Sequence, residues 1–141
     1  MSDELAFATI GELGVALRSG AVSPTELASY YLERLDSIGR GLNAVATLTP
    51  ERAMAAAQKA EDELAAGVDR GPLHGLPISL KDLIDVSGQP TTAGSRVFAD
   101  RLATADAPVT ARLRQAGAVL MGKTNLHEGA LGTASEDSAF G

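Results

Sequence analysis

The segment GPLHGLPISLKD, residues 71–82, contains the clearest strand signal in the sequence. From Leu76 to Leu80 every second residue is a branched apolar one, which is the period of a β-strand with one buried face. Ser79 and Lys81 occupy alternate positions of the same stretch. We therefore expect these two side chains to share the opposite face, at the end of the strand.

A helix and a second strand are predicted downstream. Residues 108–115 have a helical pattern that Gly117 ends, and residues 118–121 (AVLM) are a short apolar run typical of a buried strand. Residues 122–125 (GKTN) predict a turn, after which His127 could begin a helix. Because parallel strands need a crossover connection, usually a helix, this order predicts a partly parallel sheet in an α/β fold.

The front of the chain, residues 1–66, is predicted to be mainly helical. Three helix starts combine a capping hydroxyl with a first-turn acid: Thr9 with Glu12, Ser23-Pro24-Thr25-Glu26, and Thr49-Pro50-Glu51. The three helices should end near Gly20, Gly39 and Ala66, and residues 42–48 form a short strand or an extended segment. A loop over residues 67–75 then leads into the α/β part, residues 71–141, as a change of layer and not of domain.

Composition excludes several classes of function. The net charge is −6 and the twelve Lys and Arg are scattered, so no basic surface for nucleic acid is expected. There is no Cys, which excludes disulfides and thiolate metal sites, and aromatic residues make up only 4%, so the core must consist of small aliphatic residues. No apolar run is long enough to span a membrane and the start has no signal-peptide pattern, so we expect a soluble, cytoplasmic protein.

Lys81 is a candidate for chemistry, although its position alone also fits a solvent-facing lysine paired with a nearby carboxylate. A lysine that acts as a general base must lose its proton near neutral pH, and burial favours this because desolvation lowers a lysine pKa. Ser79 and Lys81 could alternatively form a serine–lysine pair on one strand face. His74 and His127 are best explained as partly exposed polar residues, and no cluster predicts a metal site.

Two small-residue segments, residues 91–95 (TTAGS) and 132–135 (GTAS), are either turns or loops whose amides approach an anion or oxyanion. Neither is a phosphate-binding loop, because Gly122-Lys123-Thr124 lacks the glycine that this motif requires upstream.

Four linked blocks, taken together, carry a resemblance to a known family. They are residues 71–82, 91–95, 116–126 (AGAVLMGKTNL) and 136–141 (EDSAFG), and in order and spacing they resemble the amidase-signature family. The resemblance implies an α/β/α fold around a large mixed sheet, preceded here by capped helices, with residues 1–141 forming a single incomplete domain. It implies no cofactor and no metal.

The resemblance also implies a catalytic trio of a lysine, a serine with a cis peptide bond and a nucleophilic serine. Lys81 matches the lysine, whereas the two serines should lie beyond Gly141, and Ser79, Ser95 and Ser135 do not match them. Ala130, Leu131, Gly132 and Thr133, here called the wall segment, match a stretch that passes close to the substrate. The activity implied is hydrolysis of a small-molecule carboxylic amide, with this chain inactive by itself.

Two branches of the family, and one non-catalytic alternative, stay open. His127 and Thr133-Ala134 depart from the glutaminase component of the tRNA-dependent amidotransferase, its A subunit, and Gly129 stands where many family members have Phe. These differences favour a general amidase. The partners expected are therefore an amide substrate and either further copies of the protein or the other amidotransferase subunits. The alternative is an interaction or truncated fragment, for which unpaired strand edges and exposed apolar surface predict self-association.

Overall fold

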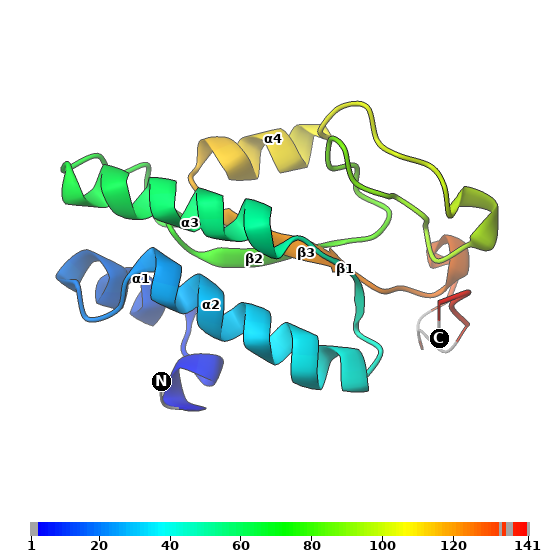
Figure 1. The fold of residues 1–141 in the computed structure, drawn as a ribbon, viewed down its shortest axis with the longest axis horizontal. Coiled ribbons are helices and arrows are strands. Elements are labelled where there is room, and N and C mark those ends of the chain that lie inside the picture. Colours follow the sequence, from blue (N-terminus) through cyan, green and yellow to red (C-terminus); the bar gives the residue numbers. More distant parts are fainter. Residues whose placement is uncertain (1–2, 133, 135–136, 141) are drawn as a thin grey trace.

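The computed structural model describes residues 3–132, 134 and 137–140 (Figure 1). The helices and strands follow in chain order as η1 (Asp3–Phe7), α1 (Ile10–Ser19), α2 (Pro24–Arg34), η2 (Leu35–Gly39), β1 (Val45–Leu48), α3 (Pro50–Ala65), β2 (Pro77–Lys81), η3 (Arg96–Phe98), α4 (Pro108–Gln115), β3 (Val119–Thr124) and η4 (Glu128–Ala130).

The sheet has three strands in the order β1-β3-β2. β2 and β3 are parallel with α4 in the connection between them, while β1 is antiparallel to β3, so the predicted partly parallel sheet is confirmed. β3 extends to Thr124, and the turn predicted over residues 122–125 is therefore wrong for its first three residues. Gly122 permits the close pairing, because a Cβ there would lie 2.1 Å from the carbonyl oxygen of Thr47.

Helices cover both faces of this sheet, which gives the expected α/β/α layering. Val119 and Met121 of β3 pack with buried alanines of α2 and α3. Leu120, between them on the pleated strand, packs on the other face with Leu80 of β2 and Leu113 of α4. Figure 1 shows α2 and α3 running side by side along the strands, with α4 apart from them.

Local capping explains where the first helices begin. Thr9 and Ser23 each accept a hydrogen bond from the amide three residues on, and the glutamate at that position bonds back to the cap amide, so both predicted capping boxes are confirmed. Pro50 also opens its helix as predicted, but Thr49 makes no side-chain cap. Its hydroxyl donates instead to the carbonyl oxygen of Met121 at 3.3 Å, because Thr49 follows β1 directly and lies beside β3.

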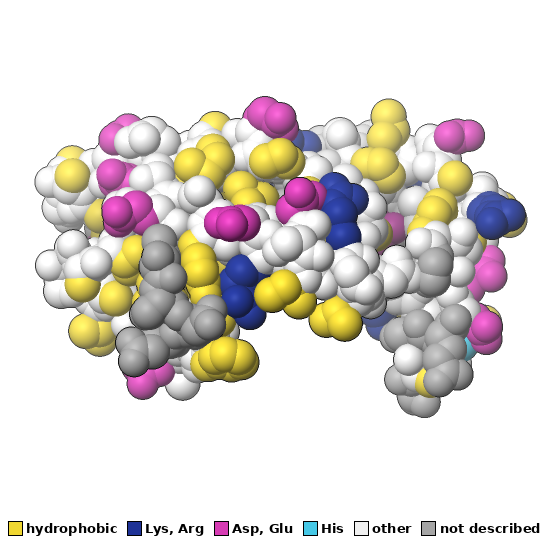
Figure 2. Space-filling model, turned by 60° about the horizontal axis from the view of Figure 1, so that its bottom comes forward, with side chains coloured by type: hydrophobic (Ala, Val, Ile, Leu, Met, Phe, Trp, Pro, Cys, Tyr) yellow, Lys and Arg dark blue, Asp and Glu magenta, His cyan; other side chains and the backbone are white. Residues whose placement is uncertain are grey.

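Apolar surface remains open on the described residues. Phe7 is 84% exposed, Val97 83% and Leu131 91%. Figure 2 shows such hydrophobic side chains between charged ones on one face of the molecule. Each outer strand, β1 and β2, has one neighbour within the described part of the chain. None of the helices described is both long and apolar enough to cross a bilayer.

Candidate functional site

Lys81 is the last residue of β2 and its main chain is firmly held. It pairs with Thr124 in the parallel ladder, and its carbonyl oxygen accepts a 2.9 Å hydrogen bond from the amide of Ile84. The side chain is exposed, and no described residue makes a hydrogen bond or ion pair with its amino group. The burial that a general base requires is therefore not supplied by the described residues.

Ser79 is also exposed, whereas Leu80 between it and Lys81 is buried. The predicted alternation holds at these three positions. No hydrogen bond joins the Ser79 hydroxyl to Lys81 among the described residues, so the geometry gives no support to a serine–lysine pair within the strand.

The wall segment begins at Ala130, the last residue of η4, and is described as far as Gly132; Thr133 lies outside the described residues. Ala130 adopts a left-handed conformation with φ of 58°, and Leu131 is almost fully exposed. A Cβ at Gly132 would lie 2.3 Å from the His127 ring, so only glycine fits there without movement of that ring. The wall segment thus combines an open apolar side chain with a constrained backbone.

The segment 91–95 is a closed turn and not an anion-binding loop. Its five amides are all used inside the chain: Thr91 bonds the Arg101 carbonyl, Thr92 the Asp82 carboxylate, Ala93 the Asp82 carbonyl, Gly94 the Thr92 hydroxyl and Ser95 the Thr92 carbonyl. The amide of Gly129 in turn donates to the Ala93 carbonyl at 2.7 Å. The turn therefore links the residue after Lys81 to the start of the wall segment.

Sequence reasoning missed the most deeply buried charges near this site. Lys123 and Asp82 are each 1% exposed and form an ion pair of 2.9 Å. The apolar run before Gly122 was the available signal. If the predicted strand had been continued to Thr124, Lys123 would have lain in a buried strand and would have required a buried partner.

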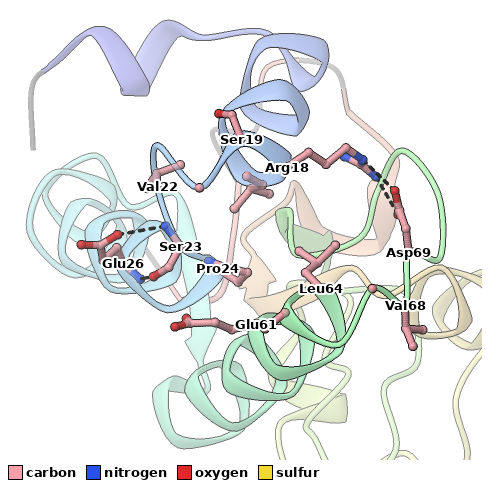
Figure 3. Close-up of a pocket in the computed structure, with 14 residues that line it drawn as sticks. Arg18, Ser19, Val22, Ser23, Pro24, Glu26, Glu61, Leu64, Val68 and Asp69 are labelled. Atoms are coloured by element: carbon pink, nitrogen blue, oxygen red, sulfur yellow. Dashed lines mark hydrogen bonds and ion pairs between the residues drawn. The ribbon is translucent and has the colours of Figure 1, made fainter.

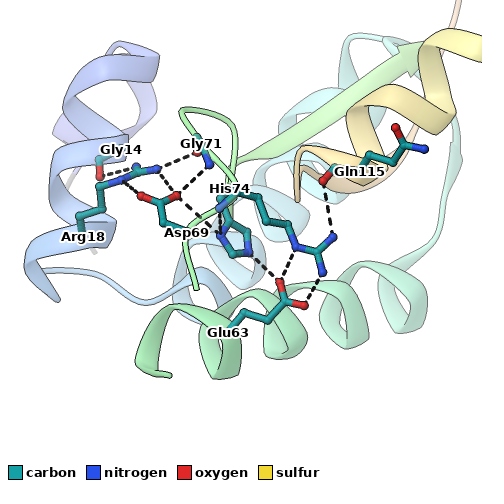
Figure 4. A network of polar contacts seen from close by, with 8 residues as sticks. Gly14, Arg18, Glu63, Asp69, Gly71, His74 and Gln115 are labelled. Atoms are coloured by element: carbon teal, nitrogen blue, oxygen red, sulfur yellow. Dashed lines mark hydrogen bonds and ion pairs between the residues drawn. The ribbon is translucent and has the colours of Figure 1, made fainter. Parts of the chain in front are cut away.

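His74 is fully buried, which contradicts the prediction of a partly exposed loop residue. Its Nδ1 accepts a 3.2 Å hydrogen bond from the amide of Arg70, and its Nε2 lies 3.0 Å from a carboxylate oxygen of Glu63, without the alignment of a hydrogen bond. The burial follows from packing, because Gly117 leaves just enough room for the ring. Figure 4 shows this network joining the 67–75 loop to α1, α3 and the end of α4.

Arginine partners favour the ionised form of the two acids in this network. Hydrogen bonds from the Arg70 side chain are the main cause that lowers the pKa of Glu63, and those from Arg18 lower the pKa of Asp69. Arg70 also donates to the carbonyl oxygen of Gln115. The network stabilises the connection into β2, and none of its described hydrogen bonds or ion pairs involves Lys81.

The sequence indicated that His127 could begin a helix. It directly precedes the single turn η4, in the N-cap position but without a side-chain capping hydrogen bond. Its Nε2 lies 3.9 Å from a carboxylate oxygen of Asp137, a residue that is largely exposed.

A cavity of about 510 Å³ lies away from these residues (Figure 3). It is formed by the end of α1, the start of α2 and the end of α3, with Leu17, Pro24 and Leu64 among its lining residues. Neither Lys81 nor any described residue of the wall segment lines it.

Comparison with known proteins decides the family. The family model described as Amidase matches residues 26–141. The chain belongs to the amidase family. The A subunit of glutamyl-tRNA(Gln) amidotransferase from Azoarcus sp. (strain BH72) is 44% identical over 134 residues, which are 95% of this chain and 27% of that protein. Its counterpart from Thermobifida fusca is 38% identical over 98% of this chain and 28% of its own length. The chain thus spans little more than a quarter of these relatives.

Solved amidase structures share its fold. A crystal structure of an amidase superposes with a TM-score of 0.85 at 40% identity, over 95% of this chain and 30% of that one. The native peptide amidase from Stenotrophomonas maltophilia gives a TM-score of 0.84 at 37% identity, over 90% of this chain and 26% of that one. The expected amidase-signature architecture is therefore confirmed for the part of the family fold that the chain covers.

Proposed function

We propose that this chain is the lysine-bearing part of a hydrolase that cleaves linear carboxylic amides with a Ser-cisSer-Lys triad, in which Lys81 is the lysine. One observation carries the proposal: Lys81 ends the parallel strand β2, where its main chain is held by pairing with Thr124 and by the hydrogen bond from Ile84, while its side chain is exposed to solvent. Family membership over residues 26–141 supports the same chemistry.

In this chemistry neutral Lys81 takes a proton from a bridging serine, which takes one from the nucleophilic serine. The nucleophile attacks the amide carbonyl, the amine leaves with a proton, and water later releases the acid from the acyl-enzyme. Lys81 is exposed in this chain, so residues beyond 141 would have to supply both the serines and the desolvation that a neutral lysine requires. We therefore propose that the 141 residues alone are inactive.

The test uses the chain extended to its natural stop codon, with amide hydrolysis measured on aliphatic, aryl and peptide-like amides. Lys81→Ala should lower kcat by at least about 10²-fold, because a general base contributes that much, while the circular dichroism spectrum stays unchanged. Lys59→Ala is the matched control, since Lys59 is a largely exposed lysine of α3. Near-normal kcat in Lys81→Ala would exclude Lys81 as the base.

A second candidate is the glutaminase component of a tRNA-dependent amidotransferase, favoured by the 44% identity to the Azoarcus protein over 95% of the chain. Its partners would be the other amidotransferase subunits, and its amide substrate would be glutamine. Ammonia release from glutamine, with no hydrolysis of simple amides, would support this role, whereas the opposite preference would support the general amidase that His127 and Gly129 favour. Either enzyme is expected in the cytoplasm.

A non-catalytic fragment is the third possibility, and it follows from the short coverage of the relatives. The DNA after codon 141 distinguishes it: a frame that continues into a Gly/Ser-rich segment supports the hydrolase, and a stop followed by unrelated sequence supports the fragment.

A further inference from the structure

Lys123 is a lysine with no access to solvent and with every donor in use. It is 1% exposed, and its Nζ donates to Asp82 Oδ1 at 2.9 Å, to the carbonyl oxygen of Pro90 at 3.0 Å and to Thr91 Oγ1 at 3.2 Å. An ammonium group has three N–H bonds, so these contacts satisfy it completely. The cation is therefore held in one position.

The carboxylate of Asp82 is equally constrained. Its Oδ2 accepts hydrogen bonds from the amide of Thr92 at 3.2 Å and from the hydroxyl of Thr92 at 2.5 Å. Because burying two charges is costly, an apolar pair of similar volume often stabilises a core as well or better. A buried pair with complete hydrogen bonding is thus better explained by what it holds in place than by net stability.

What the pair holds is the main chain on two sides of the candidate site. Asp82 follows Lys81 directly, and its amide donates to the carbonyl oxygen of Thr124 at 2.9 Å. The carbonyl oxygen of Asp82 accepts from the amide of Ala93 at 2.9 Å, and the Ala93 carbonyl accepts from the amide of Gly129 at 2.7 Å. A continuous set of hydrogen bonds therefore runs from the residue after Lys81 to the residue before Ala130.

We propose that Asp82 and Lys123 form a positioning pair, which sets the direction of Lys81 and the distance between Lys81 and the wall segment through the turn 91–95. The inference rests on the proposed function of Lys81 but concerns different residues. Neither member of the pair contacts substrate, since both are enclosed by the chain; they act through the main chain that they hold.

The first experiment uses the chain extended to its natural stop codon and a double variant, Asp82→Leu with Lys123→Met. The variant removes both charges, keeps the branched shape of the first side chain and nearly keeps the length of the second. We expect kcat/KM to fall by about 10²-fold, as a displacement of about 1 Å in a catalytic group can cause, while the urea midpoint stays near that of the unaltered protein. Normal kcat/KM in this folded variant would overturn the proposal, because it would show that the pair acts through stability alone.

A milder pair of variants covers the case in which the double variant does not fold. Thr92→Val removes the hydroxyl bound to Asp82, and Thr92→Ser keeps it. We expect Thr92→Val to lose about tenfold in kcat with little change in KM, and Thr92→Ser to recover most of that loss. Equal kcat in both variants would contradict the proposal.

Hydrogen exchange separates a failure of this inference from a failure of the proposed function. If the extended protein hydrolyses no amide, the function proposal fails, and exchange at the amides of Ala93 and Gly129 still tests the pair. Faster exchange there in Thr92→Val than in Thr92→Ser, with unchanged exchange in α2, supports the positioning role. Equal exchange at Ala93 and Gly129 in the two variants overturns it.

Discussion

The two ends of β2 each have a buried ionisable cluster, and the clusters differ in their contact with solvent. Before the strand, His74 is buried but its partners Glu63 and Asp69 are partly exposed and are bound by arginines. After the strand, Asp82 and Lys123 are both buried and neutralise each other inside the fold. The first cluster ties a surface loop to helices, whereas the second ties together the segments around Lys81.

Substitutions in the two clusters should therefore have different effects on stability and on activity. A substitution near His74 should weaken the fold but leave each folded molecule active, because no described hydrogen bond or ion pair joins that network to Lys81 or Asp82. A defect at Lys123 should reduce both stability and the precision of the candidate site. The predictions below test this contrast.

The largest effect is expected for Lys123→Met. Removing one member of a buried ion pair leaves the other charge uncompensated, so the free energy of unfolding should fall by about 3–5 kcal/mol in urea titrations. The Asp82→Leu, Lys123→Met double variant should regain most of this loss. A cost below about 1 kcal/mol for the single variant would show that Asp82 finds other partners and that the pair is not a closed unit.

Gly117→Ala should destabilise the other end of β2 by about 3 kcal/mol, within the upper range of single substitutions. Gly117 has a φ of 80°, and an added Cβ would lie 2.3 Å from Cδ2 of His74. Gly20→Ala is the matched control, because Gly20 has a similar φ of 73° with no atom within 4 Å of the added Cβ; its cost should be about 1–2 kcal/mol. Activity per folded molecule should be normal in Gly117→Ala. A large loss of activity would show that the His74 cluster, like the Lys123 cluster, affects the candidate site.

The smallest effect is expected at an exposed ion pair, Arg101 with Asp85, and it depends on pH. Hydrogen bonds from Arg101 are the main cause that lowers the pKa of Asp85 from 3.8 to about 2. A lowered carboxyl pKa stabilises the fold above pH 4, and this contribution disappears as the pH falls through about 2. Because both side chains are about a third or more exposed, solvent screens the pair, and Arg101→Met should destabilise the fold at pH 7 less than either of the preceding substitutions.

Thermal unfolding of Arg101→Met and of the unaltered protein, followed from pH 7 to pH 2, measures this difference. The two melting temperatures should converge at the acid end. A gap that persists at pH 2 would mean that Arg101 stabilises the fold by packing and not through Asp85.

The sequence predicted correctly those features whose physical cause lies within a few consecutive residues. Thr9 and Ser23 were identified correctly because a capping box lies within four consecutive residues. Lys81 and its strand were placed from a period of two and from a family resemblance. His74 and Lys123 were not, because the burial of His74 depends on packing against Gly117 and that of Lys123 on pairing with Asp82, and both partners are distant in sequence and become neighbours only in the fold.

The central position of β3 has a consequence for synthesis on the ribosome. β1 and β2 each pair only with β3 among the described residues, and β3 is the last of the three strands to be made. No sheet hydrogen bond between these strands can therefore form until residues 119–124 have left the exit tunnel. Until then, α2 and α3 can associate through their buried alanines. The nascent chain is then a pair of packed helices with two unpaired strand segments. Translation speed over the later codons, which are read while β3 passes through the exit tunnel, should thus influence how much of the chain aggregates before its sheet forms.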